Sequence, residues 1–153
     1  MSEESAVEYF QVQVALPGDG PPVEFETDEY EVDTPEEVDE RLAGVRAEPE
    51  LVVGVTYICD DADEGSFWLF LNGDRGYIHL IDGPCYTARN PAFEGLTQGA
   101  LNFRDDVGFG HEIELRNTVT RDQGFAALRH WMQGGEQLAE LTWEQEKRDE
   151  DLH

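Results

Sequence analysis

The segment from Asp61 to Gly65, Asp-Ala-Asp-Glu-Gly, is the first candidate for chemistry, because closely spaced carboxylates favour calcium. An EF-hand calcium loop needs oxygen ligands at positions 1, 3 and 5, glycine at position 6 and a bidentate glutamate at position 12. Counted from Asp61, position 5 is already Gly65 and position 12 is Asn72. We therefore expect no calcium site. The segment is interpreted as a solvated acidic loop or as a loop that contacts a partner.

Histidine and cysteine are too dispersed to predict a metal site. No two histidines stand at i and i+4 and no Cys-x-x-Cys occurs, whereas zinc needs three or four convergent ligands. We expect structural roles for the four histidines, His79, His111, His130 and His153. Cys59 and Cys85 are expected to be reduced and buried, because two cysteines without a secretory signal are typical of a reducing compartment.

Signatures of catalysis and of bound cofactors are missing from the sequence. It has no Gly-x-Ser-x-Gly, no recognisable Cys–His signature, no phosphate-binding loop and no dinucleotide-binding glycine pattern. Carboxylates are so abundant that no pair of them stands out for acid–base catalysis. We therefore predict a protein that is not an enzyme and has no catalytic residues, no metal and no cofactor.

Negative charge is the feature that most restricts the partners of this chain. Thirty-five acidic residues face ten basic ones, and the formal net charge is −25. Residues 1–64 carry 20 Asp and Glu but two Arg, whereas residues 65–153 carry 15 acidic and eight basic residues. Binding to DNA or RNA rests on neutralisation of phosphates by Lys and Arg, so we expect neither nucleic acid nor an anionic membrane as a direct ligand. A basic protein partner, a saline cytoplasm or simple solubility would each account for the charge.

Length and hydropathy predict one domain. A domain of 153 residues buries roughly two-thirds of its unfolded surface, so a hydrophobic core is feasible. We expect a single domain over 1–153, with a frayed N-terminus (1–6) and a charged C-terminal tail (146–153). No window of about 18 apolar residues occurs, and the first ten residues lack the basic and apolar parts of a signal peptide. We therefore expect a cytoplasmic protein.

Strand and helix patterns in the first half are clear. Residues 10–16 and 23–27 alternate apolar and polar side chains around a Pro- and Gly-rich turn, which predicts a hairpin. Thr34, followed by Pro and Glu, predicts a helix over 35–46. Residues 51–58 are apolar on both faces and rich in Val, which is typical of a central strand.

The second half continues with hairpins and a second helix. Strands are predicted at 67–71 and 76–81 around the turn Asn72–Arg75, and weaker ones at 98–103, 109–116 and 138–143. Thr120 and Gln123 form a second capping box. The apolar stripe of the following helix consists of Phe125, Leu128, Trp131 and Met132. The order predicts an α+β fold, a mostly antiparallel sheet with two principal helices packed on one face.

The C-terminal part carries a resemblance to a known family. Residues 120–144 combine a capped helix with an aromatic residue near its end, a glycine-containing turn and a short strand that ends on Trp143 and Glu144. Together with residues 34–38, 52–55 and 72–78, this pattern resembles the immunity protein one family of bacterial polymorphic-toxin systems, over about two-thirds of the chain. The resemblance implies a small cytoplasmic protein that neutralises a cognate toxin by binding it. The toxins linked to this family include nucleic-acid deaminases and nucleases, whose substrate clefts are basic.

Charge and resemblance together give a hypothesis for the toxin-binding residues. Two acidic loops of the N-terminal half are expected to cover the basic cleft of the toxin, with Tyr30 and Trp68 as possible aromatic anchors. The predicted partner-binding residues are Asp28, Glu29, Tyr30, Glu31, Asp60, Asp61, Asp63 and Glu64. Two alternatives stay open. The chain could be an acidic DNA or RNA mimic that inhibits another nucleic-acid-binding protein, or a non-inhibitory domain adapted to a saline cytoplasm.

Overall fold

A computed structural model describes residues 8–16, 26–60, 62–81, 84–104, 110–134 and 137–145. The expected frayed N-terminus (1–6), the charged tail (146–153), Asp61 and His153 lie outside these residues. No helix within the described ranges is long and apolar enough to cross a membrane.

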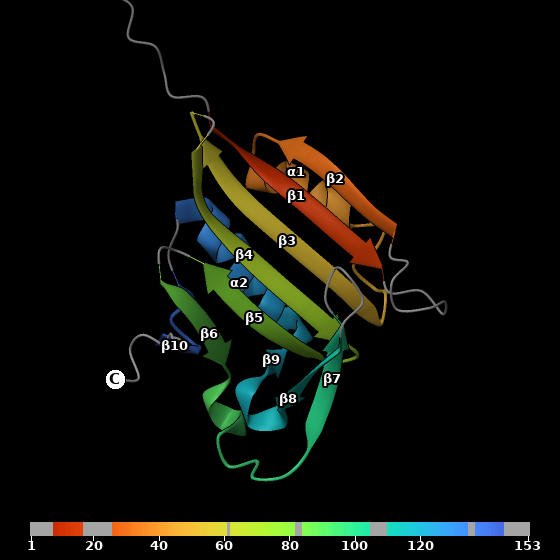
Figure 1. The fold of residues 1–153 in the computed structure, drawn as a ribbon, viewed down its shortest axis with the longest axis vertical. Helices are drawn as coiled ribbons and strands as arrows, with labels where there is room; N and C mark the ends of the chain where they lie inside the picture. The colour runs from red at the N-terminus through yellow and green to blue at the C-terminus, as the bar shows by residue number, and fades with distance from the viewer. Residues whose placement is uncertain are drawn as a thin grey trace, which may run out of the picture.

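One antiparallel sheet of eight strands organises the molecule (Figure 1). Along its main path the strand order is β10-β6-β5-β4-β3-β1-β2, and the short β9 pairs with β5. The strands are β1 (Glu8–Leu16), β2 (Glu26–Val32), β3 (Glu50–Cys59), β4 (Ala62–Asn72), β5 (Arg75–Ile81), β6 (Cys85–Arg89), β9 (Val119–Thr120) and β10 (Thr142–Gln145). Strands β2 and β10 form the two edges, and β3 and β4 lie near the centre.

A smaller two-stranded sheet lies against one end of the main sheet. It consists of β7 (Ala100–Arg104) and β8 (Gly110–Glu114), flanked by the short 3-10 helices Pro91–Phe93 and Leu115–Asn117. Phe103 of β7 is buried, with its ring centroid 6.2 Å from that of Tyr77 on β5. This aromatic contact attaches the small sheet to the face opposite the helices.

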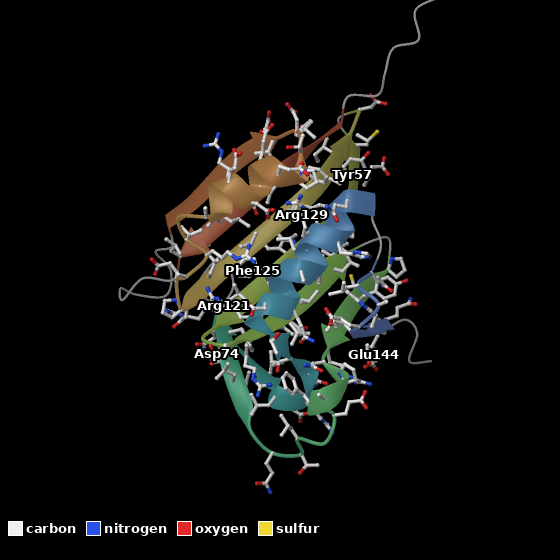
Figure 2. The ribbon with its side chains drawn as sticks, turned by 180° about the vertical axis from the view of Figure 1, so that it is seen from behind. Tyr57, Asp74, Arg121, Phe125, Arg129 and Glu144 are labelled. Carbon is white, nitrogen blue, oxygen red and sulfur yellow. The ribbon has the colours of Figure 1, made fainter. Side chains whose placement is uncertain are left out.

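Two helices cover the other face of the main sheet (Figure 2). Helix α1 (Pro35–Leu42) begins at Thr34, whose hydroxyl accepts a hydrogen bond from Glu37 N at 3.2 Å. Helix α2 (Arg121–Gly134) begins with the predicted capping box. The backbone N–H of Gln123 donates to Thr120 Oγ1 at 3.1 Å, and the side chain of Gln123 accepts from Thr120 N at 3.0 Å. The α+β fold with two helices on one face is therefore confirmed.

The hydrophobic core lies between the helices and the sheet. Strands contribute fully buried side chains such as Val12, Val53 and Leu69, and α2 contributes its predicted stripe Phe125, Leu128, Trp131 and Met132. At Gly124 a Cβ atom would lie 2.6 Å from Leu69 Cδ1, so the absence of a side chain lets α2 approach β4 closely. This approach lies near the N-terminal end of α2, since Gly124 is the fourth residue of the helix.

Arg121 connects the start of α2 to the segment between α1 and β3. Its guanidinium donates to the carbonyls of Pro49 at 3.3 Å, Gly73 at 3.0 Å and Arg46 at 2.6 Å, and also to that of Glu48. Burial lowers the pKa of Arg121, and the nearby cation of Arg46 adds to this, while Asp74 opposes it. The guanidinium remains charged at neutral pH, so the carbonyls receive charge-assisted hydrogen bonds.

The structure corrects several predicted element boundaries. Helix α1 ends at Leu42 instead of residue 46, and a turn follows. The second hairpin strand continues to residue 32 instead of ending at 27, while its predicted start at 23–25 lies outside the described residues. The last strand runs over 142–145 instead of 138–143. Strand β6 was not predicted, because residues 85–89 carry no clear alternation. The predicted acidic loop at 60–65 is wrong for residues 62–65, which extend β4 because they pair with the end of β3.

Candidate functional site

Exposed carboxylates dominate the described surface because the chain has 35 acidic residues and only ten basic ones. Among carboxylates whose side chains the structure describes, all are exposed except Asp39 and Glu50. Those two are paired with arginines. Asp39 is bound by Arg129, which also contacts Glu36 at 2.9 Å, and Glu50 is bound by Arg104 at 2.7 Å. Other arginines lie over aromatic rings, such as Arg46 on Phe125 at 4.1 Å.

The first predicted group, Asp28 to Glu31, lies on an edge strand and not in a loop. These residues belong to β2, whose only partner along the path of the main sheet is β1. Their Cα partners on β1 are Val14 for Asp28, Gln13 for Glu29, Val12 for Tyr30 and Gln11 for Glu31. The side chain of Glu31 is exposed. The side chains of Asp28, Glu29 and Tyr30 lie outside what the structure describes.

The second predicted group surrounds the β3–β4 hairpin. Asp60 follows β3 with a positive φ of 51°, and its side chain is exposed. The register of β4 shifts here, since Gly65 pairs with Tyr57 whereas Asp63 pairs with Ile58. Glu64 is therefore the extra residue of a β-bulge. Bulges bend a strand and change the direction of a side chain, and here the bulge leaves Glu64 exposed.

Register places the two groups at the same end of the sheet. The backbone row that contains Val32 at the end of β2 continues through Phe10 and Tyr57 to Gly65. Three strand spacings separate β2 from β4, which is about 14 Å. Glu31 and Glu64 thus share one end, whereas Asp28 lies about 10 Å further along β2. The structure brings together the ends of the two predicted groups, not their full lengths.

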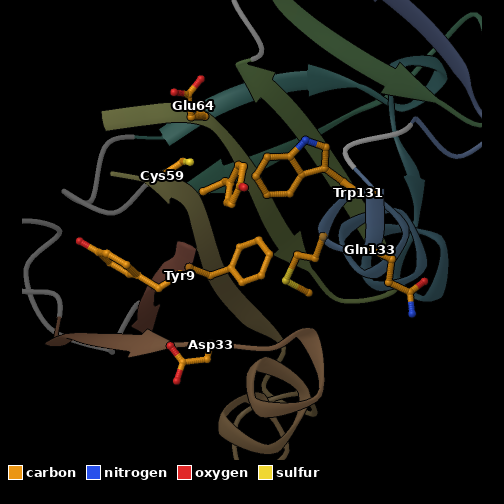
Figure 3. A pocket seen from close by; sticks show the side chains of 10 residues that line it. Tyr9, Asp33, Cys59, Glu64, Trp131 and Gln133 are labelled. Atoms are coloured by element: carbon orange, nitrogen blue, oxygen red, sulfur yellow. The ribbon is translucent and has the colours of Figure 1, made fainter. Parts of the chain in front are cut away.

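A pocket of about 830 Å³ opens at this end, between the sheet and the C-terminal end of α2 (Figure 3). Its lining includes four aromatic side chains, Tyr9 and Phe10 of β1, Tyr57 of β3 and Trp131 of α2. The ring centroids of Phe10 and Tyr57 are 5.6 Å apart, and that of Trp131 is 5.8 Å from the buried Phe67. These ring contacts help to hold the aromatic side chains of the pocket walls in place.

The polar groups of the pocket are negative or neutral. Asp33, directly after β2, and Glu64, at the bulge, border the pocket from opposite sides (Figure 3). Gln133 and Gly134 contribute the last turn of α2, which is the negative end of the helix dipole. No Lys or Arg belongs to the described lining of this pocket. Carboxylates, helix end and aromatic rings together favour a positively charged group.

Of the remaining sequence candidates within the described residues, Cys59 alone belongs to the lining of this pocket. His79 lies on β5, His111 on β8 and His130 on α2. Within the described ranges, no group of three His, Cys, Asp or Glu could hold a metal ion. Cys59 and Cys85 are not joined in a disulfide and are half-buried, so the prediction that they are buried is wrong. Cys59 ends β3 and Cys85 begins β6. Trp68 packs across Gly54, on the face of the sheet away from α2, and is not part of the pocket.

Sequence reasoning missed most of the pocket. Trp131 was predicted as a core residue, and its position at the end of an apolar helical stripe gave no sign that one edge borders a cavity. Asp33 was passed over as the residue before a helix cap, although it stands between Glu31 and α1. Tyr9 and Tyr57 become neighbours of Trp131 only through the register of three strands, which the sequence does not show.

No protein-family model and no curated protein matches this chain. The similarity to immunity proteins therefore stays a prediction that rests on the residue pattern alone.

Proposed function

We propose that this protein is an immunity protein, which binds a cognate bacterial toxin and neutralises it by covering a basic substrate cleft. The observation that carries the proposal is the excess of negative over positive charge on the described surface. The exposed carboxylates of Asp33 and Glu64 border an aromatic pocket, while the described arginines are engaged in contacts within the fold. The resemblance to the immunity protein one family supports the same conclusion from an independent direction.

Electrostatics explains how such a surface would act. A toxin that deaminates or cleaves nucleic acid needs a cationic groove for the phosphates of its substrate. A protein of net charge −25 is attracted to that groove before contact, which accelerates association and makes it sensitive to salt. Inhibition then requires only that the bound protein occupies the groove, so it needs no catalytic residue.

Aromatic side chains explain how the complex would persist after the encounter. Binding energy in protein interfaces is concentrated in a few aromatic and arginine residues that are shielded from water. The pocket supplies such a centre, and the carboxylates of Glu31, Asp33 and Glu64 lie at or near its border. The charge therefore governs the rate of association, and the pocket governs the lifetime of the complex.

The test uses the toxin domain encoded beside the gene of this protein. Nuclease or deaminase activity of that domain is measured with increasing amounts of the protein, together with the association rate at low and high salt. We expect full inhibition at equimolar protein. A lack of complex formation, together with stability that rises strongly up to molar salt, would instead favour the domain adapted to a saline cytoplasm. Inhibition of unrelated nucleic-acid-binding proteins would favour the mimic.

Paired charge reversals locate the contact. Glu31→Lys with Glu64→Lys changes the pocket end, whereas Glu94→Lys with Glu112→Lys changes the opposite end by the same total charge. We expect the first pair to slow association about tenfold more than the second, because electrostatic acceleration depends on charge close to the contact. Equal effects of the two pairs would place the contact elsewhere.

A further inference from the structure

We infer that the pocket between β1, β3, the β4 bulge and the end of α2 accepts an arginine side chain of the basic partner. This inference rests on the proposed function and specifies the chemistry of its central contact. It is carried by the combination of aromatic walls with negative groups around one cavity, because neither feature alone would select a guanidinium.

The walls suit the flat face of a guanidinium. Tyr9, Tyr57 and Trp131 line the cavity from three different elements (Figure 3). A cation within about 6 Å of an aromatic centroid is attracted by the electrons on the face of the ring. Tyr9 and Tyr57 are half-buried and supply the exposed aromatic surface, whereas Trp131 is only 5% exposed. The planar guanidinium also stacks on rings and is more weakly hydrated than an ammonium group, so it enters an aromatic pocket more readily than lysine does.

The rim supplies the compensating charge. Asp33 and Glu64 are both exposed and lie on opposite borders, so rotation about their side-chain bonds can bring a carboxylate to a cation in the mouth. Arginine presents five N–H donors in a fixed fork that matches carboxylate oxygens. The last turn of α2 adds backbone carbonyls and a partial negative charge from the same side.

Two further observations favour this occupant. The described lining contains no Lys or Arg, so no cation of those strands and that helix already fills the cavity. The bulge at Glu64 interrupts an otherwise regular pairing of β3 with β4, and it does so at the border of the pocket. At about 830 Å³ the cavity falls within the size range of ligand pockets, so it has room for the arginine together with adjoining backbone.

The test uses small probes that need no partner. Acetyl-arginine amide, acetyl-lysine amide and acetyl-citrulline amide are titrated into the full-length protein, and the indole N–H signal of Trp131 is followed by NMR. Citrulline is the matched control, because it has nearly the shape of arginine without the charge. We expect arginine to bind at least about fivefold more tightly than citrulline and more tightly than lysine. Equal binding of all three probes would overturn the inference.

Variants of Asp33 and Glu64 distinguish binding of arginine in the pocket from general attraction to an acidic protein. Glu64→Gln and Asp33→Asn keep the size of each side chain and remove one charge, and Glu112→Gln on β8 removes one charge far from the pocket. Each rim variant is expected to weaken the arginine probe about threefold or more, while Glu112→Gln leaves it within experimental error. Equal weakening by all three variants would show that only net charge matters and would overturn the inference.

Failure of this inference is distinguishable from failure of the proposed function. If the toxin domain is bound and inhibited equally well by wild type, Glu64→Gln and Glu112→Gln, the arginine pocket is wrong while the inhibitory function stands. If wild type binds the arginine probe selectively but does not bind the toxin domain, the pocket chemistry stands and the function is wrong.

Discussion

Replacement of Arg121 tests how strongly the start of α2 is bound to the α1–β3 segment and to the β4–β5 turn. This side chain is the common donor to four backbone carbonyls, three of them between α1 and β3 and one in the β4–β5 turn. Arg121→Ala removes all of these hydrogen bonds at once. It leaves the capping box of α2 intact, because that box is made by Thr120 and Gln123.

The size of the effect follows from the hydrogen bonds. A hydrogen bond to a charged group contributes about 1.5–3 kcal/mol. The four bonds share two nitrogens and water can reach the exposed carbonyls, so we count them as two bonds at the lower end of this range, or about 3 kcal/mol. For a domain of this size, 1 kcal/mol lowers the midpoint of thermal unfolding by about 2–4 °C. Arg121→Ala is therefore expected to lower it by about 6–12 °C.

The assays are equilibrium unfolding in urea, which gives the loss of free energy, and thermal unfolding, which gives the shift of the midpoint. Both are followed by far-ultraviolet circular dichroism and tryptophan fluorescence. Arg116→Ala is the matched control, because it makes the same change in net charge but removes only an exposed pair with Glu114. We expect that control to lie within about 0.5 kcal/mol of wild type. Arg121→Lys keeps the charge but loses the forked guanidinium, so its free energy of unfolding should lie about midway between those of wild type and Arg121→Ala.

Equal stability of Arg121→Ala and Arg116→Ala would refute this reasoning. It would mean that water replaces the guanidinium at the four carbonyls without loss. A large loss in both variants would assign the effect to net charge and not to the hydrogen bonds.

Three further predictions concern stability. Gly54→Ala should destabilise the fold by about 1–2 kcal/mol in urea unfolding, since the added Cβ would lie 2.4 Å from the Trp68 ring. In a Trp68→Ala background the same change should be neutral or stabilising. A loss of equal size in both backgrounds would contradict the clash. Thr120→Ala should cost about 1 kcal/mol in the same assay, because it removes the side-chain cap of α2, and an unchanged midpoint would mean that the cap is not needed. Raising salt from about 0.01 M to about 1 M should raise the urea midpoint of unfolding without changing the slope. The salt shortens the Debye length from about 30 Å to about 3 Å and so screens repulsion among the carboxylates. A falling midpoint would contradict net self-repulsion in the folded state.

Sequence patterns predicted the features of the fold that depend on interactions between residues close in sequence. The capping residues Thr34 and Thr120, the turn at Gly73 and the buried stripe of α2 all depend on residues close in sequence. The end of β4 could not be predicted in this way. Residues 62–65 have the composition of a loop, yet hydrogen bonding to the end of β3 keeps them in the sheet.

The candidate site was predictable only in its charge. Glu31, Asp60 and Glu64 were expected at a binding surface from the acidity of their neighbourhood. The pocket depends on long-range geometry, because Trp131 and Tyr57 line the same cavity only once α2 has packed on the sheet. Hydrophobic periodicity places such residues in the core and does not show that a cavity lies beside them.

The most direct test of the account is the affinity of the 153-residue protein for the cognate toxin domain that the proposal predicts, sought in the gene beside its own. It is measured at about 0.15 M salt together with the residual activity of that domain on nucleic acid. We predict a complex that abolishes this activity at equimolar protein and whose association slows as salt increases. A toxin domain that stays fully active in a molar excess of the protein would contradict the account.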